Sequence, residues 1–279
     1  PFNDAENGGR NILLENLGDF RFADVTGRTG LEMNNTRWSL AASWEDYDRD
    51  GDADLYVAND FGRNCLYRND RGADGRPRFT EVAGPAGVED TAAGMSVAWG
   101  DYNRDGRADL YVGNMFSSAG NRISYQRNFG PGQSASAVSG MQRMARGNSL
   151  FAGNADFAGF ADMSETAGVT MGRWAWSSVF ADLNNDGLQD IVVSGFGYLV
   201  GHFSWFENMA DGNFREHILN DNPGAISNAV YDFNNDGLPD IAVLMGQARE
   251  GVFIYYNLGD ETFAESYEIQ WPPSYGAAH

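Results

Sequence analysis

The most densely placed oxygen-bearing side chains of this chain stand in four nine-residue segments of one pattern. Each segment carries Asp or Asn at position 3, Asp at positions 1, 5 and 9, and Gly at position 6. Carboxylates this close repel one another unless a cation lies among them, and Ca²⁺ takes roughly six to eight oxygens in a geometry that a short loop can supply. The pattern therefore predicts four calcium loops, at residues 46–54, 101–109, 182–190 and 232–240.

The predicted ligands are the side chains at positions 1, 3, 5 and 9 and the main-chain carbonyl at position 7. The glycine at position 6 permits the sharp turn that folds the loop around an ion. With one ion in each loop, we expect about four Ca²⁺ in the chain. In loop order the predicted ligands are Asp46, Asp48, Asp50, Asp52, Asp54; Asp101, Asn103, Asp105, Arg107, Asp109; Asp182, Asn184, Asp186, Leu188, Asp190; and Asp232, Asn234, Asp236, Leu238, Asp240.

An EF-hand begins in the same way but closes with a bidentate Glu at position 12 and lies between two helices. Here position 12 is apolar in all four copies, and the residues on both sides of each loop are strand-like. The loops are therefore predicted to lie in the bends of β-hairpins, where the Asp at position 9 replaces the EF-hand Glu. An acidic turn that merely keeps a hairpin solvated is the alternative, and the four copies with one ligand spacing disfavour it. The residues at position 12 are Val57, Val112, Val193 and Val243.

A second hairpin pattern recurs between the loops, each copy being two short apolar runs joined by a turn with Gly or Asp. Four short antiparallel strands in each ~50 residues are typical of one propeller blade. We therefore predict an all-β fold, a β-propeller of four-stranded antiparallel blades that forms a single domain over residues 1–279. The copies of the second hairpin lie at residues 11–26, 64–82, 148–163, 203–218 and 253–265.

The two kinds of hairpin are unequal in number, because five outer hairpins accompany four calcium-loop hairpins. The sequence thus predicts four full blades and a half-blade. Strands of the calcium-loop hairpins are expected nearer the propeller axis. We expect the domain to be an incomplete part of a larger ring, which a longer natural chain or another segment completes.

One long interval between loops contains an insertion at residues 115–147. Its apolar residues Val138, Met141 and Ala145 follow helical spacing, which predicts a short helix over residues 136–146. Packing over a blade edge is the plainer interpretation of this helix, and a partner-binding element is the alternative.

Aromatic residues fall into two groups. Trp44 and Trp99 stand two residues before their loops, on strands whose residues alternate in size, so we expect them in the contacts between blades. Trp174 and Trp176 share a strand face near a blade entrance. They are candidates for stacking on a sugar, although a place in the core is the more common role.

Composition excludes several classes of partner. The formal net charge is −20 and the isoelectric point is about 4.3, which argues against nucleic acids and anionic membrane surfaces. No apolar run approaches the ~20 residues of a membrane span. Cys65 is the single cysteine, so the chain has no internal disulfide, and we expect this side chain to act as a small buried hydrophobe.

With these residues in view, the chain resembles the calcium-binding propeller repeats called FG-GAP or VCBS repeats. All four loops match the Asp-x-Asp/Asn-x-Asp-Gly-x-x-Asp pattern of that family. Residues 11–195 look most like its bacterial UnbV and cartilage acidic protein branch, and residues 196–279 look like more generic VCBS repeats. The UnbV domain that often follows such a propeller is not visible here. The closer likeness rests on residues 113–122, 145–150 and 171–176.

The resemblance implies a secreted, periplasmic or cell-surface protein whose ions stiffen the blades. It implies a recognition, adhesion or scaffold module with a protein or glycan ligand, or with other domains or subunits that complete the ring. The alternative is the propeller part of an extracellular enzyme, a polysaccharide lyase or hydrolase with its site in the central channel.

Catalysis finds little support in the residues themselves. His202, His217 and His279 are scattered, and none lies near a Ser/Asp or Cys constellation in the sequence. No phosphate-binding glycine loop and no Cys/His cluster for zinc or haem is present. A catalytic role for calcium is disfavoured, because each loop already offers about five protein ligands and leaves few open positions.

Overall fold

The computed structural model describes residues 5–197, 201–247 and 249–270. Within them the chain forms four four-stranded antiparallel sheets and one two-stranded sheet. In each four-stranded sheet the strands follow one another in chain order, so every pairing is a hairpin between neighbours. Apart from a helical insertion and two helices of four residues, the fold is thus all-β, as the alternation of two hairpins predicts.

The sheets take the following strands. The two-stranded sheet is β1 (Leu14–Asn16) and β2 (Phe22–Asp24). The first four-stranded sheet is β3 (Trp38–Glu45), β4 (Asp54–Asp60), β5 (Cys65–Asn69) and β6 (Phe79–Glu81), and the second is β7 (Gly94–Gly100), β8 (Asp109–Asn114), β9 (Ser149–Gly153) and β10 (Phe160–Asp162). The third is β11 (Ala175–Ala181), β12 (Asp190–Gly195), β13 (His202–Asn208) and β14 (Phe214–Asn220), and the fourth is β15 (Ala225–Tyr231), β16 (Asp240–Met245), β17 (Gly251–Asn257) and β18 (Phe263–Gln270).

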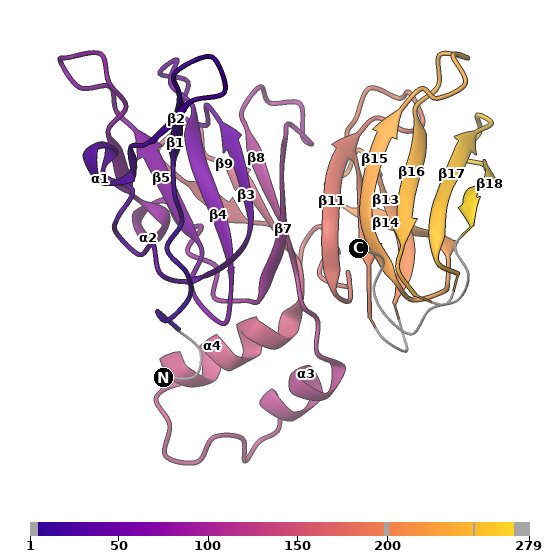
Figure 1. Ribbon diagram of the computed structural model, residues 1–279. Coiled ribbons are helices and arrows are strands. Elements are labelled where there is room, and N and C mark those ends of the chain that lie inside the picture. The colour runs from indigo at the N-terminus through magenta and orange to yellow at the C-terminus, as the bar shows by residue number, and fades with distance from the viewer. Residues whose placement is uncertain (1–4, 198–200, 248, 271–279) are drawn as a thin grey trace.

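The four sheets pack face to face in succession across the molecule (Figure 1). Their first strands lie against one another, β3 against β7, β7 against β11 and β11 against β15. The hairpin that carries the acidic loop therefore supplies the strands at the centre of the arrangement, and the other hairpin supplies the outer strands. This arrangement is propeller-like.

Apolar side chains fill the three contacts between consecutive sheets. Tyr56 and Leu66 of the first sheet pack against Leu110 and Val112 of the second. Other clusters fill the contact between the second and third sheets and the contact between the third and fourth, where Trp205 is fully buried. A fully buried side chain of this kind contributes about 1.5–3 kcal/mol to the free energy of folding, so these contacts dominate the packing of the sheets.

The insertion at residues 115–147 contains two helices, α3 (Ser118–Ser124) and α4 (Ala135–Arg146), where the sequence predicted one. They pack against each other beyond the ends of the strands rather than over the edge of a sheet (Figure 1). The segment follows the last residue of β8, at the end opposite its acidic loop. The α3 sequence gives little helical signal, because Gly120 and the serines around it are poor helix formers.

The helix α4 is anchored to the second sheet through one buried carboxylate. Arg143 Nη2 lies 2.7 Å from Asp90 Oδ2, and the Asn114 Nδ2 and Ser149 Oγ atoms donate to the same oxygen at 3.0 and 2.5 Å. Two further helices of four residues, α1 (Thr26–Thr29) and α2 (Ala83–Ala86), follow β2 and β6. None of the helices in the described part of the chain has the length and apolarity needed to cross a lipid bilayer.

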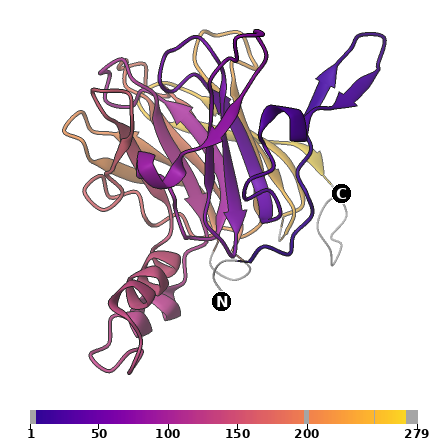
Figure 2. The same ribbon diagram turned by 90° about the vertical axis from the view of Figure 1, so that its left-hand side faces the viewer.

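The expectation that Trp44 lies between blades is wrong for this side chain. Trp99, its counterpart in the second sheet, packs against the first sheet, whereas Trp44 is 47% exposed. The reason is positional, because no four-stranded sheet of the described chain precedes this sheet and covers that face. The hairpin of β1 and β2 projects away from the sheets instead (Figure 2).

Candidate functional site

The four acidic loops occupy equivalent places in the four sheets. Each connects the first strand of a sheet to the second, and its position-9 Asp is the first residue of the second strand. That Asp pairs with the last residue of the first strand, as in Glu45 with Asp54 and Ala181 with Asp190. The bends of the hairpins therefore carry the predicted ligands. In chain order the loops are called the first to fourth acidic loops.

One hydrogen bond sets the turn in every loop. The position-1 carboxylate accepts from the position-6 glycine N–H, at 3.1 Å in the first loop and 2.9 Å in each of the others. The glycines have positive φ angles of 80–92°, a conformation that other residues adopt only with strain. The glycines are Gly51, Gly106, Gly187 and Gly237.

The geometry of the first loop fits a bound cation. Carboxylate oxygens of Asp46, Asp48 and Asp50 lie within 4.8 Å of one another. Asp46 Oδ1 is buried and has no hydrogen-bond partner among the described residues. A buried carboxylate oxygen without a partner is costly, and a hard cation is the group that these oxygens suit best.

The position-9 carboxylate has a second role that the sequence did not reveal. In each sheet its Oδ2 accepts from the main-chain N–H of loop position 2, and its Oδ1 accepts from the main-chain N–H of the last residue of the third strand. The eight bonds measure 2.7–3.1 Å, and all four carboxylates are fully buried. We call each such pair of bonds the carboxylate latch of its sheet. The residues are Asp54, Asp109, Asp190 and Asp240.

The latch remains compatible with metal binding, because a carboxylate oxygen can accept more than one bond. Burial raises the pKa of Asp54, Asp109 and Asp190 to about 7, although the main-chain donors oppose that shift. A cation beside these groups would favour their charged form.

Asparagines at the ends of the outer strands connect consecutive loops. Asn208 Nδ2 donates to the Tyr102 carbonyl in the second loop at 2.8 Å, and Asn257 Nδ2 donates to the Leu183 carbonyl in the third loop at 2.7 Å. The second sheet has Gly153 at this place, and there the Arg107 side chain donates to the Gly153 carbonyl at 2.7 Å.

The two candidate aromatic residues for sugar stacking are not brought together as a platform. The Trp176 ring is stacked on Phe196, with centroids 4.8 Å apart, and its residue is 42% exposed. Trp174 is partly buried and forms an isolated bridge with Met115. Sugar stacking at these residues stays a prediction.

His202 and Cys65 are held by structural surroundings. His202 Nε2 lies 2.6 Å from Glu216 Oε1, and Arg173 Nε donates to His202 Nδ1 at 2.8 Å. Cys65 is buried in the first sheet, and the expectation of a small buried hydrophobe is confirmed.

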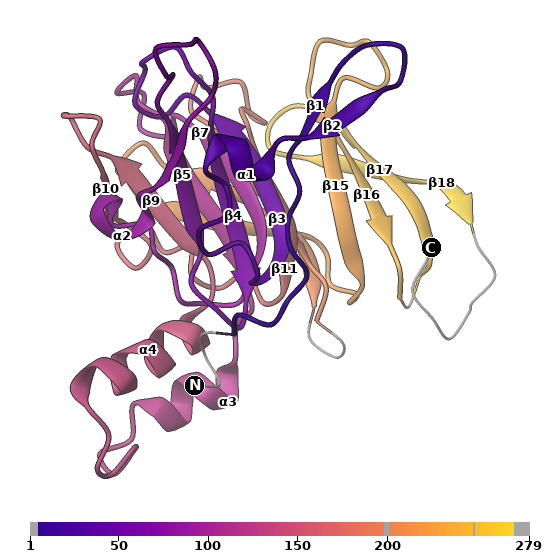
Figure 3. The same ribbon diagram turned by 60° about the vertical axis from the view of Figure 1, so that its left-hand side comes forward.

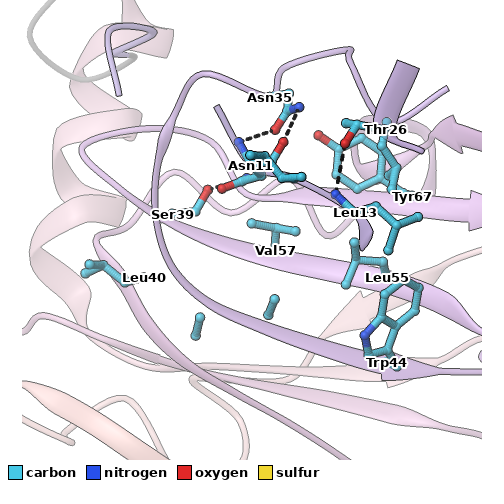
Figure 4. Close-up of a pocket in the computed structure, with 14 residues that line it drawn as sticks. Asn11, Leu13, Thr26, Asn35, Ser39, Leu40, Trp44, Leu55, Val57 and Tyr67 are labelled. Atoms are coloured by element: carbon cyan, nitrogen blue, oxygen red, sulfur yellow. Dashed lines mark hydrogen bonds between the residues drawn. The ribbon is translucent and has the colours of Figure 1, made fainter. Parts of the chain in front are cut away.

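An apolar groove lies on the exposed face of the first sheet (Figure 4). Its volume is about 450 Å³, and Trp44, Leu55 and Tyr67 line it in one cross-strand row. The segment before β3 forms the opposite wall, where Asn35 Oδ1 accepts from the Asn11 N–H at 2.9 Å. Sequence reasoning missed this groove, because residues of three separate segments build it.

Comparison with known protein families decides what the repeated units are. The FG-GAP-like repeat family matches residues 46–112 and 196–243, and the FG-GAP repeat family matches residues 93–138. The chain contains FG-GAP repeats. These matches span the first, second and fourth acidic loops. They do not test the likeness to the UnbV branch, which stays a prediction.

A solved structure that is similar to this chain is the V. cholerae biofilm matrix protein Bap1. The sequences are 12% identical, the TM-score is 0.46, and the match covers 94% of this chain. The match covers 33% of that protein, so the chain spans about a third of its length. No curated protein matches the chain.

Replacement of a latch carboxylate tests its structural role apart from any ion. In EDTA at a pH above 7, Asp190→Asn should lower the free energy of unfolding by about 2–3 kcal/mol. The amide has an NH₂ group in place of one oxygen, and this donor would face the N–H of Leu183 or Asn208, which is also a donor. Asp186→Asn, in the exposed part of the same loop, should lower it by less than about 1 kcal/mol. Urea unfolding followed by tryptophan fluorescence measures both, and equal losses would contradict the latch.

Proposed function

We propose that this chain is a secreted, periplasmic or cell-surface calcium-binding module that serves recognition, adhesion or scaffolding. The observation that carries the proposal is the fourfold repetition of one hydrogen-bonded turn, in which the position-1 carboxylate accepts from the position-6 glycine; in the first loop three carboxylates also lie close together. The buried Asp46 Oδ1 without a partner supports a cation in the first loop. FG-GAP repeats in the chain support the same conclusion.

In this proposal the ions are structural. An ion among positions 1, 3, 5, 7 and 9 cancels the repulsion of the carboxylates and joins the first strand of a sheet to the second. Because position 9 also holds the end of the third strand, the ion stabilises three strands through one side chain. Each loop lies at the end of its hairpin and supplies most of its own ligands, which suits an ion that stiffens the sheet.

An extracellular location agrees with the type of site. Calcium sites of extracellular modules bind with dissociation constants of roughly 10⁻⁴–10⁻³ M, far weaker than those of cytosolic buffers. We place these loops in the weaker class because they lack the bidentate Glu that closes an EF-hand at position 12.

Removal of calcium should destabilise the whole protein. With four sites filled by millimolar Ca²⁺, the melting temperature should exceed that in EDTA by about 10 °C, because an ion that binds only the folded state stabilises it by mass action. Differential scanning calorimetry measures the shift. A matched variant with Asn at the four position-1 residues should lose most of the response. Identical melting curves of the natural chain in EDTA and in calcium would contradict the proposal.

The loops differ at position 7, and this difference predicts their relative affinities. Arg107 forms an ion pair with Asp105 inside the second loop, whereas the third and fourth loops carry Leu188 and Leu238 at that position. A guanidinium that already neutralises a ligand carboxylate competes with the ion. The second loop should therefore bind calcium more weakly than the third.

Exchange of these residues tests the competition. Arg107→Leu should tighten calcium binding in the second loop about fivefold, and Leu188→Arg should weaken it in the third loop by a similar factor, which corresponds to about 1 kcal/mol. The amide signals of Gly106 and Gly187 in ¹⁵N-edited NMR report the two loops separately during a calcium titration. Unchanged midpoints at both glycines would refute the competition.

The exposed face of the first sheet supports a proposal about the partner. Each four-stranded sheet has one face that carries Trp44 or its equivalent, and a second face on the other side. At the three contacts between sheets, the later sheet presents the first of these faces and the earlier sheet presents the second. In the fourth sheet this second face is partly exposed, at Ala242 and Leu244 of β16. The occupant that fits the groove by this rule is therefore the fourth sheet of a second copy of the chain.

Head-to-tail association of copies is measurable by multi-angle light scattering over a range of concentrations. The natural chain should form dimers or larger assemblies, and Leu40→Asp combined with Trp44→Asp should make it monomeric. Phe20→Asp, at a 98% exposed residue of the β1–β2 turn outside the groove, should leave assembly unchanged. A natural chain that is monomeric at all concentrations would overturn this choice of partner.

A further inference from the structure

A second cluster of metal-ligating side chains, with different ligands from those of the acidic loops, lies on the outer hairpins of the third and fourth sheets. Glu207 of β13, His217 of β14 and Glu261 of the β17–β18 turn bring one carboxylate or imidazole ligand atom each within 4.8 Å of one another. The first two residues belong to the third sheet and the last to the fourth, so the cluster lies where these two sheets meet.

The two ligands of the third sheet are held in place by packing. Trp205 is fully buried, stands opposite His217 in the strand pairing, and stacks on its ring with centroids 4.5 Å apart and planes 13° apart. The Glu207 side chain is 8% exposed and lies beside the imidazole. The Glu261 side chain is 39% exposed, so the cluster is open to solvent on that side.

The His217 Nε2 atom cannot form hydrogen bonds with both of its close neighbours at once. Its Nε2 lies 2.7 Å from Glu207 Oε2 and 3.1 Å from Arg215 Nε, which is a donor. If Nε2 carries a proton toward Glu207, it cannot accept from Arg215. If Nε2 accepts from Arg215, its lone pair and a carboxylate oxygen face each other without a proton between them. A cation among these atoms satisfies the nitrogen and the carboxylate together.

We propose that Glu207, His217 and Glu261 bind a transition-metal dication, with Zn²⁺ the first choice. One imidazole nitrogen and two carboxylates are ligands that zinc accepts, and a solvent molecule completes four-coordination. The imidazole distinguishes this site from the acidic loops, which offer only the oxygens that calcium prefers. The proposal is independent of calcium binding in those loops.

Arg215 is the counter-charge of the cluster in the absence of the metal. Its Nη2 lies against Glu207 Oε2 and 2.9 Å from Glu261 Oε2. The side chain is 51% exposed, so the guanidinium can turn into solvent when a metal takes its place. The bound ion then joins the third and fourth sheets at their outer edge.

Isothermal titration of the calcium-saturated chain with Zn²⁺ tests this site, because filled acidic loops cannot contribute to the signal. We expect about one Zn²⁺ in the chain. His217→Ala and Glu261→Gln should each weaken binding by at least about tenfold, and Arg215→Gln should tighten it because a competing cation is removed. Asp260→Asn, which changes a neighbouring carboxylate on the same turn, is the matched control and should bind as the natural chain does.

Cobalt provides a readout of the ligands themselves. Co²⁺ in place of Zn²⁺ should give visible d–d absorption of a low-coordinate nitrogen and oxygen site in the natural chain, and this absorption should be lost in His217→Ala. Glu261→Gln lies on an exposed turn, so it keeps the test valid if His217→Ala does not fold. Absence of Zn²⁺ binding in both the natural chain and Arg215→Gln would overturn the proposal and leave an ion-pair cluster. Binding that survives both ligand substitutions would overturn it as well.

Discussion

A buried carboxylate that accepts two main-chain N–H groups holds each four-stranded sheet of this protein together. It stands at the start of the second strand and reaches both the beginning of its own loop and the end of the third strand. A fully buried negative charge is unfavourable unless donors or cations surround it. The main-chain donors provide part of that compensation, and a cation at the loop would provide the rest. The loop and the outer hairpin therefore depend on the same side chain in every sheet.

The latches also place the sheets relative to one another. Asn208 and Asn257 are themselves latch donors through their main-chain N–H groups, and their side chains donate to a carbonyl of the preceding loop. The loops of the second, third and fourth sheets thus form one connected polar network at one end of the strands, while apolar clusters fill the contacts between the sheets. At the other end of β8 the helices α3 and α4 extend away from the sheets, and the ion pair of Arg143 with Asp90 anchors α4. The first and fourth sheets stand at the two ends of this succession (Figure 3).

The hairpins were predictable because two short apolar runs around a turn recur along the chain. The loops were predictable because ligand type and position are local properties. The latch was not, since the donor of Asp190 Oδ1 is Asn208, which lies in another strand. The exposure of Trp44 depends on the absence of a preceding four-stranded sheet in the described chain, and the repeat pattern alone suggests burial. The cluster of Glu207, His217 and Glu261 draws its residues from two sheets, so no local sequence motif predicts it.

Two kinds of cation site would stabilise the sheets. The acidic loops, which offer only oxygen ligands, would act within each sheet, and the cluster of Glu207, His217 and Glu261 would act between the third and fourth sheets. Ions in the loops would contribute more than this cluster, because they would act on the same carboxylates that form the latches. The most direct measurement is anomalous X-ray diffraction from crystals of this chain grown in calcium. A peak in each of the four acidic loops, about 2.3–2.6 Å from its carboxylate oxygens, is the expected result. Loops with the same backbone and intact latches but no anomalous peaks would contradict calcium as their ligand.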